Sequence, residues 1–339
     1  MNFRLGMALA IIAVIAIGLM FTFERPPAES LQNGYRGTGM VQIRHPDAVD
    51  ALAAANVLPE ITPALPAAGQ TAGQQYMNVQ VLRDVDANEF IRLMTDLTKW
   101  VAPTQGCAYC HAQGEDLSAD TLYTKVVARR MLEMTRHINA NWKDHVSTTG
   151  VTCYTCHRGN PVPQNVWFTD PSPPSAENAG NRAGQNTPAR AVGLTSLPYD
   201  PFTTFLGSDE EAIRVVSTTA LPAGSNRTIK QTEWTYGLMI HMSEALGVNC
   251  TFCHNSRSFT DWDQSSPQRA TSFYGIRLVR DVNKTYISPL AAQLPGVRLG
   301  PYGDAPKVSC ATCHQGANKP LLGQSLLKDY PELSATPSR

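Results

Sequence analysis

This 339-residue sequence has no cysteine outside a single repeated motif. All 8 cysteines belong to copies of that motif, so no thiol remains for a separate disulfide framework or for lipid attachment. An excess of charge is also missing, because 28 basic side chains balance 28 acidic ones, and nothing indicates a nucleic-acid partner. Aromatic residues make up only 8%, while glycine and proline number 24 each, so a stable core needs material from another source.

The repeated motif is Cys-x-x-Cys-His, in which two thiols can reach both vinyl groups of one porphyrin while the imidazole lies under the iron. The copies are Cys107-Ala-Tyr-Cys110-His111, Cys153-Tyr-Thr-Cys156-His157, Cys250-Thr-Phe-Cys253-His254 and Cys310-Ala-Thr-Cys313-His314. A zinc site would not require a histidine directly after every second cysteine. The sequence therefore predicts four covalently bound haem c groups, which would also supply the missing core.

An uncharged apolar run of 19 residues, 5–23, lies near the N-terminus. At about 1.5 Å per residue, it can cross a hydrocarbon core of about 30 Å. A cleaved signal peptide usually has a shorter apolar region of about 7–15 residues, so we predict an uncleaved transmembrane anchor in residues 1–25. Bacterial haem attachment takes place outside the cytoplasmic membrane. We therefore expect a single-pass protein of that membrane with a periplasmic haem domain.

The chain after the anchor falls into two halves, and each half repeats the order helix, motif, helix, motif. The expected helices are Asp86–Trp100, Thr121–His145, Thr232–Leu246 and Ser266–Tyr286. Asp86 and Glu89 predict a capping box at the start of the first helix. This order predicts a mainly α fold with long irregular segments, a multihaem cytochrome built from two pseudo-two-fold-related two-haem units, plus the N-terminal transmembrane helix.

The predicted division of the chain follows its composition, because glycine and proline are concentrated between the expected helices. It comprises the anchor 1–25, an extended surface segment 26–75, the first two-haem unit 76–160, a Pro-rich linker 161–225, the second two-haem unit 226–320 and a C-terminal tail 321–339.

The second axial ligand of each iron decides the function, because each motif supplies only its own histidine. The four motif ligands are His111, His157, His254 and His314. An open opposite position is typical of an enzyme, whereas a filled one indicates electron transfer, and Met/His ligation gives a higher potential than His/His ligation. The remaining histidines are His45, His137, His145 and His241. Several methionines also compete for these positions.

The helix before the first motif of each half offers a methionine ligand. Met94 lies 13 residues before Cys107, and we predict that it binds the first haem, although methionine also packs well in ordinary helices. Met239 precedes the third motif by a similar spacing and is the predicted ligand of the third haem. Met242 lies on roughly the same helix face and competes with it, whereas His241 lies about 200° around the helix.

The helix after the first motif carries two further predicted ligands. On a continuous helix Met131 and His145 lie within about 40° of each other, so they share one stripe. We predict that Met131 binds the second haem. The equivalent position in the second half is Val279, which cannot bind iron, so the fourth haem needs a ligand from elsewhere, and His145 is best placed. One helix would then serve both haems, and the array would run first, second, fourth, third.

These residues resemble the tetrahaem cytochrome c subunit of purple-bacterial photosynthetic reaction centres over about residues 75–335. The stretches with the strongest resemblance are Cys250-Thr-Phe-Cys-His-Asn255, Ser266-Pro-Gln-Arg-Ala270, Gly275-Ile-Arg-Leu-Val-Arg-Asp281 and Leu327-Lys-Asp-Tyr-Pro-Glu-Leu333. The family pattern of three Met/His haems and one His/His haem agrees with the ligands above. The resemblance further implies that the third haem lies nearest the photo-oxidised bacteriochlorophyll pair and that Arg269 raises its potential. Without the resemblance, Arg269 is better explained as a solvated charge in the first turn of a helix.

The resemblance implies an electron carrier with six-coordinate irons, not an enzyme. Its partners would be a soluble periplasmic donor, either a cytochrome c or a high-potential iron–sulfur protein, and the reaction-centre membrane subunits with the light-harvesting antenna. Well-known members of the family carry a lipid on an N-terminal cysteine. This sequence has no such cysteine, so the apolar helix must provide the anchor.

Two other functions fit parts of the pattern. A membrane-anchored tetrahaem quinol dehydrogenase that feeds a periplasmic reductase would share the topology, but such proteins are shorter and use mainly His/His ligation. A multihaem enzyme would need one vacant iron position, and the four predicted ligands argue against it.

Overall fold

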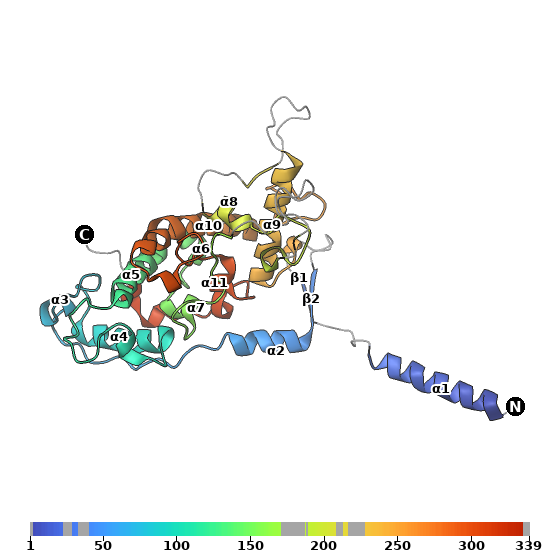
Figure 1. The fold of residues 1–339 in the computed structure, drawn as a ribbon, viewed down its shortest axis with the longest axis horizontal. Coiled ribbons are helices and arrows are strands. Elements are labelled where there is room, and N and C mark those ends of the chain that lie inside the picture. The colour runs from blue at the N-terminus through green and yellow to red at the C-terminus, as the bar shows by residue number, and fades with distance from the viewer. Residues whose placement is uncertain are drawn as a thin grey trace.

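The computed structural model of the chain is mainly helical, which confirms the mainly α part of the predicted fold (Figure 1). It describes residues 3–22, 29–32, 41–170, 187, 189–207, 213–215 and 228–334. Within these ranges the strands form one antiparallel hairpin, in which β1, Glu29–Gln32, pairs with β2, Val41–Arg44.

Helix α1, Phe3–Met20, is the predicted N-terminal apolar helix, and it stands apart from the helical body (Figure 1). None of its side chains is buried, and it is long and apolar enough to cross a membrane. Such a surface is unfavourable in water, so it favours insertion into lipid. Residues 1, 2 and 23–25 of the predicted anchor lie outside the described residues.

The segment 26–75, expected to be extended, contains regular structure in the part that the model describes. Besides the hairpin, it forms helices α2, Pro46–Ala55, and α3, Ala72–Gln75. The signal for α2 is local, because Pro46 occupies the first turn and the His45 side chain accepts a hydrogen bond from the Asp47 N–H at 3.2 Å. Residues 26–28 and 33–40 lie outside the described ranges.

The long helices of the two halves are present with shifted bounds. They are α4, Ala87–Val101; α5, Tyr123–Asn141; α9, Ile229–Leu246; and α10, Pro267–Val282. Asp86 caps α4, but the predicted capping box does not form, because Glu89 pairs with Arg92 at 2.6 Å. Helix α9 begins earlier than expected, because Thr228 and Gln231 form a capping box of their own.

The expected helix 121–145 is not continuous. Helix α5 ends at Asn141, Trp142 has non-helical dihedrals of φ −114° and ψ 34°, and a separate turn, α6, spans Lys143–Val146. The angular count that placed Met131 and His145 on one stripe assumed an unbroken helix. That argument therefore does not hold, and the position of His145 has to be judged from its own contacts.

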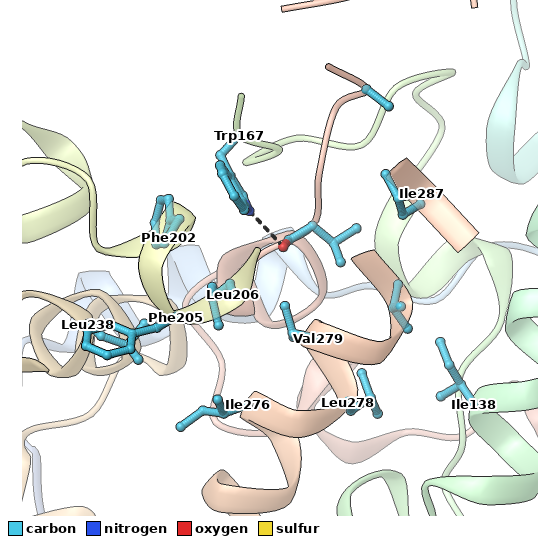
Figure 2. Close-up of a cluster of buried hydrophobic side chains, with 13 residues drawn as sticks. Ile138, Trp167, Phe202, Phe205, Leu206, Leu238, Ile276, Leu278, Val279 and Ile287 are labelled. Carbon is cyan, nitrogen blue, oxygen red and sulfur yellow. Dashed lines mark hydrogen bonds between the residues drawn. The ribbon is translucent and has the colours of Figure 1, made fainter. Parts of the chain in front are cut away.

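The segment 161–225, expected to be a linker, is packed against the second half wherever it is described. Helix α8, Pro201–Leu206, buries Phe202, Phe205 and Leu206 in a cluster with α9 and α10. Figure 2 shows this cluster, with the Trp167 indole N–H donating to the Val308 carbonyl at 2.9 Å. Residues 171–186, 188, 208–212 and 216–225 of this segment, with five of its prolines, lie outside the described ranges.

The two halves share this core, because Ile138 of α5 packs in the same cluster as Leu278 and Val279 of α10 (Figure 2). A second buried cluster joins the C-terminal segment to the first half. There Tyr330 is fully buried, packs edge-on against Trp100 with ring centroids 4.8 Å apart, and donates its hydroxyl hydrogen bond to Asp96. The segment around Tyr330 therefore packs against α4 of the first half.

Candidate haem-binding sites

The second and fourth motifs face one cavity of about 880 Å³. Pockets for small ligands and cofactors range over about 300–1,000 Å³. The motif cysteines and histidines that line the cavity are Cys110, Cys153, Cys156, His157, Cys310, Cys313 and His314. Met131 and His145 line it as well, together with Leu278 and Val279 of the second half. Thiols, imidazoles and thioethers from the two halves thus meet on the largely apolar wall of one cavity.

The backbone of the second and fourth motifs explains why their ligands point the same way. Helices α7, Cys153–His157, and α11, Cys310–His314, are single turns in which positions i, i+3 and i+4 share one face. In both turns the threonine at the third position accepts a hydrogen bond from the N-cap N–H, at 3.0 and 2.9 Å. Each turn ends at a left-handed residue, Arg158 or Gln315.

The first and third motifs have a different backbone. Their cysteine loops form 3₁₀ turns, η1 at Gly106–Tyr109 and η4 at Cys250–Phe252. The four motifs therefore alternate along the chain between a 3₁₀ form and an α form.

Every motif histidine is oriented by a hydrogen bond to a backbone carbonyl. The Nδ1 to oxygen distances are 2.9 Å for His111 and Leu117, 2.8 Å for His157 and Asn160, 2.9 Å for His254 and Phe259, and 2.9 Å for His314 and Ala317. A carbonyl can only accept, so Nδ1 carries the proton and Nε2 keeps its lone pair. This is the arrangement that a metal-ligating imidazole needs.

His145 has the same arrangement, although it lies outside the motifs. Its Nδ1 donates to the Thr271 carbonyl at 2.9 Å, and its ring lies edge-on to that of His314 with centroids 6.0 Å apart. With metal–nitrogen bonds of about 2 Å, two imidazoles that hold one metal ion from opposite sides would have centroids about 6 Å apart. The distance between the two ring centroids therefore fits two imidazoles that share one iron.

Among the described residues, the other histidines make no such Nδ1 to carbonyl hydrogen bond. His137 places Nε2 against Asp281 at 2.7 Å, and His45 caps α2 at the surface. His241 is buried against Phe202 with ring centroids 4.5 Å apart, and its Nε2 has no partner among the described residues. His241 thus lies in the core without the hydrogen bond that orients the motif imidazoles.

Burial favours the neutral form of three of these imidazoles. It lowers the pKa of His314 to about 4, and it lowers the pKa of His145 and His157 in the same direction. A neutral ring is the form that binds a metal. Burial also raises the pKa of Cys153 to about 11 and of Cys310 to about 12, so an uncharged thioether suits both positions better than a thiolate.

Of the three predicted methionine ligands, only Met131 is part of the cavity wall. Met131 lines the cavity, whereas Met94 packs with the buried cluster around Trp100. Met242 also lines the cavity, but Met239 does not, and both pack against the core of the second half. The third motif contributes only Phe252 to the lining, and its cysteines and His254 lie outside it, so these contacts do not decide between Met239 and Met242.

Arg269 lies beside the third motif. Its guanidinium donates to the Asp261 carbonyl at 2.8 Å and to Ser265 at 2.7 Å, and it stacks over Trp262 at 4.2 Å. Burial lowers the pKa of His254, and the positive charge of Arg269 lowers it further. A fixed positive charge therefore acts on this site, and Arg269 is not the freely solvated residue that its sequence position alone would indicate.

Arg158 provides a test of whether the cavity fits a haem. It follows His157 directly and donates to the Ala55 carbonyl at 2.9 Å. Its Nε and Nη2 are buried and have no partner among the described residues. Two orphaned guanidinium donors on the residue next to His157, which lines the cavity, match the carboxylates of haem propionates, so the residues present fit the group. Our sequence analysis did not identify Arg158.

Two further residues that sequence reasoning missed lie beside His145. They are Thr271, through its carbonyl, and Gly275, where an added Cβ would lie 2.5 Å from the imidazole Cε1. Both contacts cross more than 120 positions of sequence, so no local pattern announces them.

The family described as photosynthetic reaction centre cytochrome C subunit has a model that matches residues 24–334. The chain belongs to this family. Photosynthetic reaction center cytochrome c subunits of similar sequence include that of Rubrivivax gelatinosus, 53% identical over 96% of this chain and 89% of the relative. The subunit of Thermochromatium tepidum is 48% identical over 97% of this chain and 81% of its own length. That of Roseobacter denitrificans is 42% identical over 96% and 89%.

As a reaction-centre cytochrome c subunit, the protein is an electron carrier that binds haem c covalently and associates with the reaction centre. Its apolar N-terminal helix fits a membrane anchor. This assignment supports the reaction-centre interpretation and not the quinol dehydrogenase alternative.

We predict that the chain does not fold when haem is not attached. At about 24 cal/mol per Å³ of cavity, loss of the group that fills this space costs on the order of 20 kcal/mol, more than the usual total stability of about 5–15 kcal/mol. Near-ultraviolet circular dichroism and limited proteolysis of chain made without haem attachment should show no fixed tertiary structure. A protease-resistant haem-free chain with native-like signals would contradict this prediction.

Proposed function

We propose that this chain carries four haem c groups, one at each motif, and relays electrons from a soluble periplasmic donor to the photo-oxidised bacteriochlorophyll pair. The observation that carries the proposal is the uniform Nδ1 to carbonyl hydrogen bond, which leaves Nε2 of every motif histidine free to bind iron. A bound haem c supplies reversible one-electron chemistry, and the protein sets its potential through the axial ligands and nearby charges.

All four irons are six-coordinate in this proposal. Met94, Met131 and Met239 bind the first, second and third haems opposite His111, His157 and His254, and His145 binds the fourth opposite His314. The spacing of the His145 and His314 rings supports the last pair, and the position of Met131 in the cavity wall supports the second. Filled positions suit a protein that exchanges electrons and does not bind small molecules.

The two-haem units 76–160 and 226–320 are related by duplication in this proposal. The alternation of a 3₁₀ motif and an α motif in each half supports this relation. The haems would then run in the order first, second, fourth, third. The close approach of the second and fourth motifs supports this order, because the sulfurs of Cys156 and Cys313 lie 2.7 Å apart.

The remaining parts of the proposal concern the surroundings of the subunit. Helix α1 crosses the membrane once, and residues 26–339 with their haems lie on the periplasmic side. The donor is a cytochrome c or a high-potential iron–sulfur protein, and the membrane partners are the reaction-centre subunits and the light-harvesting antenna. Arg269 raises the potential of the third haem, because a fixed positive charge favours the reduced iron.

Flash photolysis of membranes tests the electron-transfer role directly. We expect haem oxidation in the α-band to follow the flash with the same time course as reduction of the bacteriochlorophyll pair. If the pair is reduced while the haems stay reduced, the relay fails, although the haems would remain.

The number and ligation of the haems are tested on the purified holoprotein. Mass spectrometry of the denatured chain should show four haem adducts, and a redox titration should resolve one His/His haem below three Met/His haems. Carbon monoxide should bind none of them. A different adduct count, or strong binding of carbon monoxide by the unmodified protein, would contradict six-coordination at four sites.

Two substitutions distinguish the candidate methionine ligands of the third haem. Met239→Leu should lower the potential of this haem and open it to carbon monoxide, whereas Met242→Leu should leave it unchanged. The reverse result would assign Met242 as the ligand.

In the same titration Arg269→Gln should lower the potential of the third haem alone without carbon monoxide binding, and an unchanged potential would exclude a tuning role for Arg269.

A further inference from the structure

The imidazole of His145 lies against helix α10, which belongs to the other half of the chain. The Thr271 carbonyl of α10 accepts the Nδ1 hydrogen bond at 2.9 Å. Gly275 lies one turn further along, and an added Cβ would lie 2.5 Å from the Cε1 and 2.8 Å from the Nδ1 of His145. A side chain at i+4 normally covers the carbonyl of residue i in a helix. Glycine at this position therefore leaves both the space for the ring and the access to the carbonyl.

The short turn that carries His145 is held by the same helix. Helix α6 has only four residues and follows the break at Trp142, so it is too short to be stable by itself. The Trp142 indole N–H donates to Asp281 Oδ2 at 2.8 Å, and the backbone N–H of His145 donates to the Trp142 carbonyl at 2.9 Å. Asp281 is fixed in turn by Thr285, whose hydroxyl donates to Oδ1 at 2.9 Å.

We propose that α10 positions the axial ligand of the fourth haem: Gly275 and the Thr271 carbonyl set the plane and reach of the His145 imidazole, and the Asp281–Trp142 hydrogen bond fixes the turn that bears it. The inference rests on the proposed function in taking His145 as that ligand. Gly275, Asp281 and Trp142 are positioning residues, because they act on the iron only through His145.

This arrangement has a physical consequence for the ligand itself. A hydrogen bond from Nδ1–H to a carbonyl makes the imidazole a stronger donor and fixes its tautomer. Residues of the second half thus control a ligand that comes from the first half. The electronic state of the fourth haem would then depend on how the two halves are packed.

The test uses Gly275→Ala in the full haem-loaded protein, with Gly296→Ala as the matched control, because an added Cβ at Gly296 meets nothing within 4 Å. We expect Gly275→Ala to shift the low-spin electron paramagnetic resonance signal of the His/His haem and to let one haem of the four bind carbon monoxide. The control should change neither. Trp142→Phe removes the indole donor while an aromatic ring remains, and it should shift the same signal even if Gly275→Ala does not fold.

His145→Ala separates this inference from the ligand assignment. Loss of the His/His signal in His145→Ala, with an unchanged signal in both Gly275→Ala and Trp142→Phe, would overturn the positioning role and leave the ligand in place. If Gly275→Ala does not fold, an unchanged signal in Trp142→Phe overturns it. A His145→Ala protein that retains the His/His signal would show that His145 is not the ligand, and both proposals at this haem would fall.

Discussion

The hydrogen bond from an imidazole Nδ1 to a main-chain carbonyl is the interaction on which this protein depends. It recurs at all four motif histidines and at His145. Because the acceptor is backbone, the tautomer is set by the path of the chain and not by another side chain. Short, well-capped turns at the second and fourth motifs and 3₁₀ turns at the other two are therefore part of the chemistry. Burial adds to this effect by keeping His314 neutral.

The packing of the two halves explains why a chain with few aromatic residues has a defined centre. Ile138 of the first half and Leu278 of the second belong to one buried cluster (Figure 2), and both also line the cavity that the second and fourth motifs face. The walls of the cavity come from segments that are far apart in sequence. Haem attachment and the packing of the halves are therefore linked, since neither half provides a complete wall.

Sequence patterns predicted what depends on local chemistry. The cysteine spacing, the apolar helix and the approximate bounds of α4 and α10 follow from neighbouring residues. The break at Trp142 could not be predicted, because the indole finds its partner, Asp281, 139 positions away. The same holds for Gly275, which matters only because an imidazole from the other half lies against it. The methionine ligands stay predictions, because thioethers form no directional hydrogen bonds that would reveal which of them faces an iron.

The burial of Tyr330 against α4 joins a segment near the last described residue to the first half, with a hydrogen bond to Asp96 across 234 positions. Contacts of such long sequence separation form late in folding. The buried cluster around Trp100, in which Met94 also packs, is therefore complete only once the segment around Tyr330 has joined it.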